Sequence, residues 1–158
     1  MINQQSSISN PQVKVVLLVE DNQDDVELSL RVLKRNYINN EVIVTRDGEE
    51  ALDYLFGKGV YAGRDMSVMP AIILLDLKLP KVEGLEVLRS IRADERTKLL
   101  PVIILTSSKE DKDLVQGYKL GAISYIRKPI DFFKLNKAVR QLARNFYCDS
   151  KQYPFFKT

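Results

Sequence analysis

Five side chains that could act together chemically stand at or directly after short apolar runs of the sequence: Glu20, Asp21, Asp76, Thr106 and Lys128. Three carboxylates in one crevice repel one another and raise each other's pKa unless a cation neutralises them. An oxygen-only set of ligands suits Mg²⁺, which binds one or two carboxylates and keeps several waters. A carboxylate can also attack a phosphoryl group, while an ammonium and a hydroxyl stabilise that group in transit. The residue types therefore indicate phosphoryl acceptance assisted by Mg²⁺, provided that the fold brings them together.

The elements that would position these side chains are five buried strands separated by amphipathic helices. The apolar runs, each bounded by turn residues, are Val13–Val19, Glu41–Thr45, Ala71–Leu75, Val102–Thr106 and Ser124–Ile126. Between the runs, apolar residues recur at steps of three and four, which is helical spacing. A further stripe of this kind follows the fifth run, at Phe132, Leu135, Val139, Leu142 and Phe146. Strands that alternate with helices form a parallel sheet covered on both faces. We therefore expect an α/β fold, a doubly wound (βα)5 flavodoxin-like parallel sheet with strand order 2-1-3-4-5.

In such a sheet the functional crevice lies beyond the carboxyl ends of the strands. Lys128 stands at one of these ends, next to Pro129. The proline fixes a turn, and a cis peptide bond between the two residues would aim the amine into the crevice. A lysine within reach of Asp76 holds that carboxylate ionised and can pair with an oxyanion added to it. Thr106 is weaker evidence by itself, because threonine is a common strand residue.

Other interpretations of the acidic residues explain less. Asp24 and Asp25 would lie in the first turn of a helix, where carboxylates complement the helix dipole, and we assign them that role. Glu20 and Asp21 could cap the same helix, but capping explains neither the lysine nor the hydroxyl across the crevice. A calcium-binding EF-hand is excluded, because the loop lacks its glycine and has Val32 where the closing glutamate belongs.

Composition excludes several classes of protein. The chain has 158 residues, no histidine and one cysteine, Cys148. Catalysis by histidine, zinc bound by histidine, an internal disulfide and a multi-thiolate metal site are therefore excluded, and a reducing, cytoplasmic location is expected. With 24 Lys+Arg against 21 Asp+Glu, we expect no nucleic-acid binding. No apolar run approaches the roughly 20 residues that span a bilayer, so we expect no membrane contact.

Three segments do not fit the alternation of strands and helices. Residues 1–12 are polar and are interpreted as a disordered lead-in without the features of a signal peptide. The glycines of Gly57–Asp65 follow a helix instead of a strand, so the segment is interpreted as a flexible surface loop or a partner-binding edge and not as a dinucleotide motif. The tail, residues 148–158, contains Tyr153-Pro154-Phe155-Phe156. These aromatic residues could pack on their own domain or form an interface with a second copy or a kinase.

Over residues 13–147 the sequence resembles a bacterial response-regulator receiver domain. The matching segments are Val19-Glu20-Asp21-Asn22, Leu74-Leu75-Asp76-Leu77-Lys78-Leu79-Pro80, Gly84, Ile104-Leu105-Thr106-Ser107-Ser108, Gly121-Ala122 and Lys128-Pro129. The combination is specific, because the end of one strand after another carries the residue type that the family has there.

The resemblance implies a role for each residue of the set, with Asp76 as the phosphoacceptor. The implied Mg²⁺ ligands are Asp21, Asp76, the backbone carbonyl of Lys78 and, through water, Glu20. Thr106 would be the switch hydroxyl and Lys128 the phosphate partner. Tyr125 falls at the switch aromatic, whose ring turns inward when Thr106 moves toward the phosphoryl group, although an aromatic residue at a sheet edge would also explain it.

The segments Phe56–Arg64 and Leu79-Pro80-Lys81 and the overall length are similar to the regulators paired with cyanobacterial phytochromes. This narrower resemblance implies a phosphohistidine of a light-regulated sensor histidine kinase as the phosphoryl donor. The chain leaves no room for an output domain, so we expect a single-domain regulator that acts by docking and is not an enzyme beyond its own autophosphorylation and autodephosphorylation. Members of this subgroup tend to form homodimers through the fourth helix, the fifth strand and the last helix, a face that would include Tyr125 and Ile126.

One residue departs from the family pattern. Receivers most often have Asn or another small or neutral residue two places after the phosphoacceptor, where this chain has Lys78. Its ammonium could compete with the metal for the acidic pocket, or shield the phosphoryl group from water. We therefore expect altered autodephosphorylation.

Two other function classes remain as alternatives. An aspartate-nucleophile phosphohydrolase also forms an acyl phosphate with Mg²⁺, but it needs a second aspartate two places after the nucleophile, where Lys78 stands. A pseudo-receiver binds partners without phosphorylation, and the intact set of Asp76, Thr106 and Lys128 argues against it.

Overall fold

The computed structural model describes residues 14–36, 40–107 and 111–147. Five parallel strands form one sheet in the order β2-β1-β3-β4-β5. The strands are β1 Lys14–Val19, β2 Asn40–Thr45, β3 Ile72–Asp76, β4 Val102–Thr106 and β5 Ser124–Arg127. The predicted fold class and strand order are confirmed, and no predicted strand limit differs from these by more than one residue. The predicted lead-in (residues 1–12) and aromatic tail (residues 148–158) lie outside the described residues.

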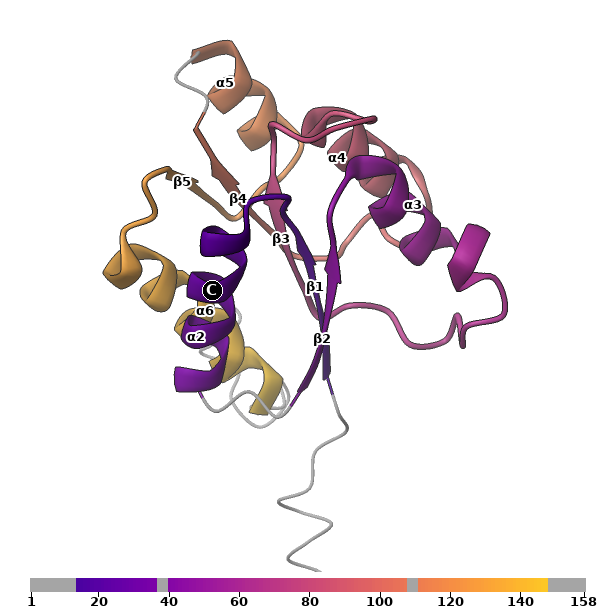
Figure 1. Cartoon of the computed structure of the whole chain (residues 1–158), viewed down its shortest axis with the longest axis horizontal. Helices are drawn as coiled ribbons and strands as arrows, with labels where there is room; N and C mark the ends of the chain where they lie inside the picture. Colours follow the sequence, from indigo (N-terminus) through magenta and orange to yellow (C-terminus); the bar gives the residue numbers. More distant parts are fainter. Residues whose placement is uncertain (1–13, 37–39, 108–110, 148–158) are drawn as a thin grey trace, which may run out of the picture.

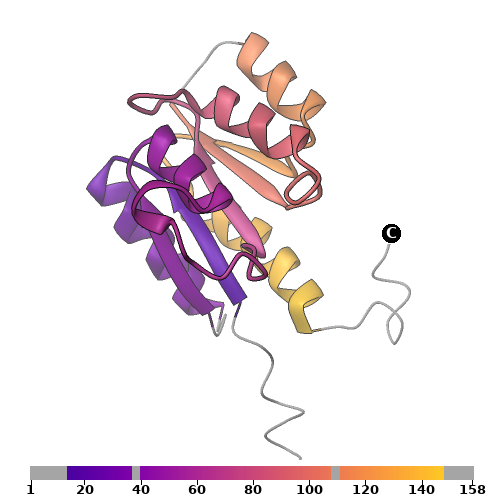
Figure 2. The ribbon, with the colours of Figure 1, turned by 90° about the vertical axis from the view of Figure 1, so that its right-hand side faces the viewer.

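Helices cover both faces of the sheet. They are α2 Gln23–Arg35, α3 Gly48–Phe56, α4 Gly84–Ala93, α5 Asp111–Lys119 and α6 Phe132–Tyr147, with a short 3₁₀ turn η1 at Gly59–Tyr61. Figure 1 shows α2 and α6 side by side on one face, with α3 and α4 on the opposite face. In the view of Figure 2, α4 and α5 lie side by side. Among the described residues, no helix is long and apolar enough to cross a membrane.

Alternate residues of each strand pack on opposite faces, as side chains of a strand must. In β1, Leu17 and Val19 contact the core under α3 and α4, whereas Val16 and Leu18 contact the core under α2 and α6. All of these side chains are buried. A strand buried on both faces has no polar side, which is why the runs of the inner strands β1, β3 and β4 are almost continuously apolar in the sequence. The edge strands β2 and β5 keep exposed polar residues such as Glu41 and Arg127.

Helix α2 begins directly after β1 because Asn22 caps it. The Asn22 side chain accepts a hydrogen bond from the backbone N–H of Asp25, which satisfies a donor that the helix leaves free. Asp24 and Asp25 lie in the first turn, and Lys34 and Arg35 in the last, so both ends complement the helix dipole. The cap places the first turn of α2 at the carboxyl end of the sheet.

The segment after α3, Gly57–Asp65, for which a flexible surface loop or a partner-binding edge was expected, makes several hydrogen bonds with its neighbours. The Arg64 guanidinium lies 4.1 Å from the centre of the Tyr54 ring, and its Nε donates to the Tyr54 carbonyl at 2.6 Å. Its Nη1 also donates to the Val68 carbonyl at 2.8 Å. The Tyr61 hydroxyl donates to Glu50 at 2.9 Å. One arginine thus joins α3 to the chain that leads into β3.

A second arginine holds the connection that leads into β5. Arg92 in α4 donates to the carbonyl of Leu100 before β4 and to those of Leu120 and Gly121 after α5. Hydrogen bonds from a charged donor to carbonyls are stronger than those between neutral groups. This arrangement fixes the start of β5, and Lys128 directly follows the end of that strand.

Candidate functional site

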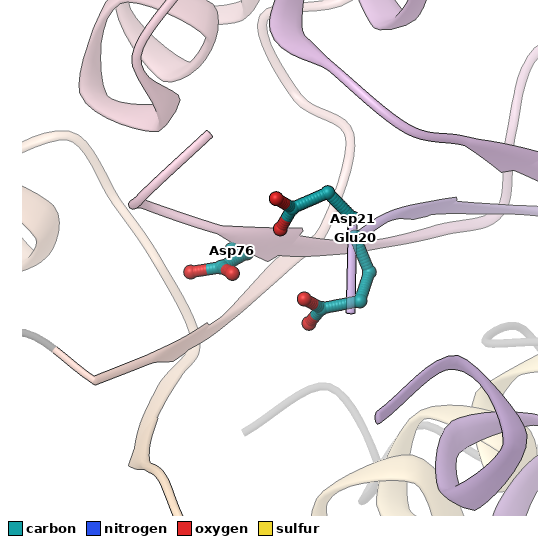
Figure 3. Close-up of side chains that lie close together, drawn as sticks. All are labelled: Glu20, Asp21 and Asp76. Carbon is teal, nitrogen blue, oxygen red and sulfur yellow. The ribbon is translucent and has the colours of Figure 1, made fainter. Parts of the chain in front are cut away.

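Three carboxylates meet beyond the carboxyl ends of β1 and β3. One oxygen from each of Glu20, Asp21 and Asp76 lies within 4.8 Å of the others. Figure 3 shows the three side chains around a common space. Glu20 and Asp76 are buried, and Asp21 is exposed. The site therefore has two carboxylates in a medium of low polarity and one at its rim.

Lys128 neutralises part of this charge. Its Nζ lies 2.9 Å from an oxygen of each of three carboxylates, on Glu20, Asp76 and Asp25. Its backbone N–H donates to the Thr106 carbonyl at 2.8 Å, which fixes the residue to the end of β4. The Lys128–Pro129 peptide bond is cis, the isomer considered for this turn from the sequence. The ammonium thus contacts Glu20 and Asp76, which were predicted to lie in the site, and Asp25, which was not.

The positive charge of Lys128 does not fully balance the negative charge of the buried carboxylates. Burial, together with the negative charge of Asp76, raises the pKa of Glu20 to about 7 against the opposing hydrogen bond from Lys128. Burial disfavours the Lys128 ammonium, but its hydrogen bonds to Glu20, Asp76 and Asp25 outweigh burial and hold its pKa above the ordinary value. The Lys128 ammonium therefore stays charged, but its single positive charge does not keep the Glu20 carboxyl fully ionised at neutral pH.

The donor set fits a divalent cation. The buried Glu20 Oε1 has no hydrogen-bond partner among the described residues, and buried polar atoms of this kind are rare unless water or an ion completes them. Two oxygens on opposite sides of Mg²⁺ are about 4.2 Å apart, so the carboxylate oxygens need only a small movement or a bridging water to share one ion. The residues present can thus hold an oxygen-ligated cation.

The loop after β3 holds Asp76 by its backbone. The Lys78 N–H donates to Asp76 Oδ1 at 3.0 Å, and the Gly84 N–H donates to the Leu77 carbonyl at 2.9 Å. A Cβ atom on Gly84 would lie 2.3 Å from the Asp76 carbonyl oxygen. The start of α4 therefore packs directly on the backbone of the acceptor residue. The Lys78 side chain is exposed.

Thr106 and Tyr125 belong to β4 and β5, the two strands that follow β3 in the sheet. In the parallel register Asp76 lies opposite Leu105, so Thr106 is the next residue along β4, and it is buried. Strand alternation directs Thr106 to the same face as Ile104 and Tyr125, which pack toward α3, α4 and α5. The Tyr125 ring is half-buried, with its centre 6.4 Å from that of Tyr118 in α5. Strand alternation thus directs the side chains of the predicted switch pair, Thr106 and Tyr125, to the same face of the sheet.

Asp25 is the residue that sequence reasoning missed. Its assigned role, complementing the dipole of α2, is only part of its environment, because its carboxylate also lies 2.9 Å from Lys128 Nζ. The signal that could have found it was its position: a helix capped directly after β1 must keep its first turn at the edge where the other strands end.

The burial of Glu20 predicts an unusual pH dependence for the metal-free protein. A carboxyl whose pKa is raised by folding, from 4.5 to about 7, is stabilising while protonated, so its contribution is lost as the pH rises between these values. The loss is roughly 3 kcal/mol in the free energy of unfolding, and the chain has no histidine to titrate in the same window. We expect the melting temperature of metal-stripped protein to fall from pH 5 to pH 8, and Mg²⁺ to raise it more at pH 8.

The matched control for this prediction is Glu20→Gln, which keeps the shape of the side chain and should remove most of the pH slope. A melting temperature that is flat between pH 5 and pH 8, and equally flat with Mg²⁺, would contradict the charge balance described above.

The comparison with protein families gives one match. Residues 16–140 match the family described as response regulator receiver domain. Among curated proteins, Response regulator Rcp1 of Synechocystis sp. is 38% identical over 149 residues, which are 94% of this chain and 98% of that protein.

Solved structures similar to this chain share its fold over most of its length. The bacteriophytochrome response regulator RtBRR has a TM-score of 0.74 and 48% identity, over 83% of this chain and 78% of that one. The phosphorylated cyanobacterial phytochrome response regulator RcpA has a TM-score of 0.72 and 36% identity, over 85% and 94%. The Mn(2+)-bound form of Rcp1 has a TM-score of 0.70 and 39% identity, over 80% and 89%.

Proposed function

Because the chain belongs to the response regulator receiver domain family, we propose that it accepts a phosphoryl group on Asp76 from a phosphohistidine of a sensor kinase. The observation that carries this proposal is the buried Asp76 carboxylate, hydrogen-bonded to Lys128 at 2.9 Å and adjacent to two further carboxylates. A carboxylate oxygen of Asp76 attacks the phosphorus, the bond from phosphorus to the imidazole nitrogen breaks, and the imidazole, already protonated on its other ring nitrogen in the donor, leaves as the neutral base. The product is an acyl phosphate.

The chain's own residues would hold the cation and the transferred group. Glu20, Asp21, Asp76 and the backbone carbonyl of Lys78 are the proposed ligands of Mg²⁺, which would neutralise the charge on the phosphoryl oxygens and the carboxylates. The similar regulator Rcp1 has been solved in a Mn(2+)-bound form, which supports a divalent ion in this chain. Lys128 and the Thr106 hydroxyl would bind the remaining phosphoryl oxygens.

The proposed partner is a sensor histidine kinase of the phytochrome class, in the cytoplasm. Its support is the similarity of this chain to a bacteriophytochrome response regulator and to a cyanobacterial phytochrome response regulator. No histidine occurs in this chain, so a phosphohistidine donor must be supplied by another protein.

The signal would leave through the face formed by α5, β5 and α6, which we propose as a homodimer interface. Three large apolar side chains are exposed on α5 and just before β5, namely Val115, Tyr118 and Ile123. Tyr118 and Ile123 border a groove of about 290 Å³ that also reaches Tyr125 and Ala138 of α6. An inward turn of the Tyr125 ring, following Thr106 toward the phosphoryl group, would change the shape of this groove. Phosphorylation would thereby alter docking at the face.

Incubation with acetyl phosphate and Mg²⁺ separates this function from its two alternatives. A stable phosphoprotein that is absent from Asp76→Asn supports the receiver. Sustained release of phosphate would instead indicate an aspartate-nucleophile phosphohydrolase, and no adduct would indicate a pseudo-receiver that acts without phosphorylation. Sedimentation of the same samples tests the dimer face, which is contradicted by a monomer in both the phosphorylated and unphosphorylated states.

Lys78 should influence how long the acyl phosphate lasts. Its exposed side chain starts two residues from Asp76, where an ammonium can shield the phosphoryl group from attacking water. We expect Lys78→Asn to shorten the lifetime of the acyl phosphate several-fold, measured as the decay of labelled protein after removal of the donor. The exposed Lys81, on the same loop, offers a matched control as Lys81→Asn. Equal decay rates in wild-type protein and Lys78→Asn would reject the shielding role.

A further inference from the structure

The ion pair between Asp25 and Lys128 differs from the other two ion pairs of this lysine. Its Oδ2 lies 2.9 Å from Lys128 Nζ, and the two side chains are only 21% and 14% exposed. Asp25 comes from the first turn of α2, whereas Glu20 and Asp76 come from the ends of β1 and β3. It is also absent from the group of three carboxylates that could share a metal ion. Asp25 thus binds the lysine without being a candidate ligand of the cation.

An ammonium has three N–H donors, and Lys128 directs them at three carboxylates. Two of these acceptors, Glu20 Oε2 and Asp76 Oδ2, belong to residues that a divalent cation would also bind. A cation bound through these two carboxylates would repel the ammonium and weaken their hold on it. The contact with Asp25 is the one that the cation leaves intact.

We propose that Asp25 is a positioning residue that retains Lys128 in the site when a divalent cation engages Glu20 and Asp76, and thereby increases the affinity for that cation. Two effects act in the same direction. Asp25 offers the displaced ammonium a counter-charge in a poorly solvated place, and it adds a negative charge that attracts the incoming cation. The inference rests on the proposed function, because the cation site is part of that function.

The test is the affinity of the protein for Mn²⁺, measured from the electron paramagnetic resonance signal of the free ion. Asp25→Asn keeps the size of the side chain and leaves the backbone N–H that Asn22 caps. We expect it to weaken Mn²⁺ binding about five- to tenfold, which corresponds to the net contribution of one hydrogen bond. Asp24→Asn removes the same charge from the same turn at an exposed position, and we expect it to change the affinity less than about twofold.

A double-mutant cycle with Lys128→Met shows whether Asp25 acts through the lysine. In that background the loss caused by Asp25→Asn should shrink to the direct effect of its charge on the cation, about the size seen with Asp24→Asn, whereas a role in the stability of α2 alone would persist unchanged. If Lys128→Met does not fold, the comparison of Asp25→Asn with Asp24→Asn tests the inference by itself. Equal Mn²⁺ affinity in wild-type protein and Asp25→Asn, or equal losses in the two single variants, would overturn the inference and leave the cation site standing. Wild-type protein that binds no Mn²⁺ would overturn both.

Discussion

Lys128→Met is expected to lower the free energy of unfolding of the metal-free protein by about 3–5 kcal/mol at pH 8, the cost of leaving buried charges without their partner. The ammonium is hydrogen-bonded to Glu20 and Asp76 and paired with Asp25, each at 2.9 Å. Without it, repulsion among the remaining carboxylates destabilises the fold until they are protonated or bind a cation. Stability should therefore recover at pH 5, and at pH 8 when Mg²⁺ is added. Urea denaturation under these three conditions measures the effect.

The control for this substitution is Lys134→Met, at an exposed position of α6. It removes the same charge and adds the same side chain, and its effect should stay within about 0.5 kcal/mol. A loss in Lys128→Met no larger than this, at pH 8 without metal, would show that the ammonium does not neutralise the buried carboxylates.

Gly84→Ala is expected to destabilise the protein by about 2–4 kcal/mol, within the range for steric conflicts that the surroundings cannot relieve. The added Cβ would lie 2.3 Å from the Asp76 carbonyl oxygen and 2.5 Å from the Leu77 Cα. These are backbone atoms at the end of β3, so no rotamer change makes room. Relief requires α4 or the acceptor residue itself to move. Phosphorylation of the fraction that folds should also slow, because Asp76 is displaced from Lys128.

Gly117→Ala in α5 is the matched control. Its Cβ would also meet an atom at 2.8 Å, but that atom is the far end of the Ile104 side chain, which can rotate. Alanine also favours a helix interior over glycine by about 1 kcal/mol, so the net effect should be near zero. Equal stability of the two variants in urea would contradict the close packing of α4 on Asp76.

The fold was predictable from the sequence because the three inner strands, β1, β3 and β4, are buried on both faces. Runs such as Val102–Thr106 have no polar side, and apolar steps of three and four separate them, so periodicity alone indicates alternating strands and helices. The segment between α3 and β3 was less accessible to this reasoning. Its order depends on Arg64, whose hydrogen bonds to Tyr54 and Val68 join residues without a recognisable pattern.

The site was predictable as far as it lies at strand ends. Glu20, Asp76 and Lys128 each lie at or just after the end of a strand, so the topology brings them together, and the structure shows the lysine bonded to both carboxylates. The roles assigned to Thr106 and Tyr125 stay predictions. Asp25 was missed because it lies in a helix, where the dipole already explains a carboxylate. Its contact with Lys128 depends on the angle at which α2 leaves β1, which the sequence pattern does not encode.

The central claim is that Asp76 carries the phosphoryl group, and locating that group in the chain tests it most directly. Borohydride reduces an aspartyl phosphate to homoserine, which peptide mass spectrometry assigns to a single position. After incubation with acetyl phosphate and Mg²⁺, we predict homoserine at position 76 of the wild-type protein and none in Asp76→Asn. Homoserine at another position, or equal labelling of the two proteins, would contradict the account.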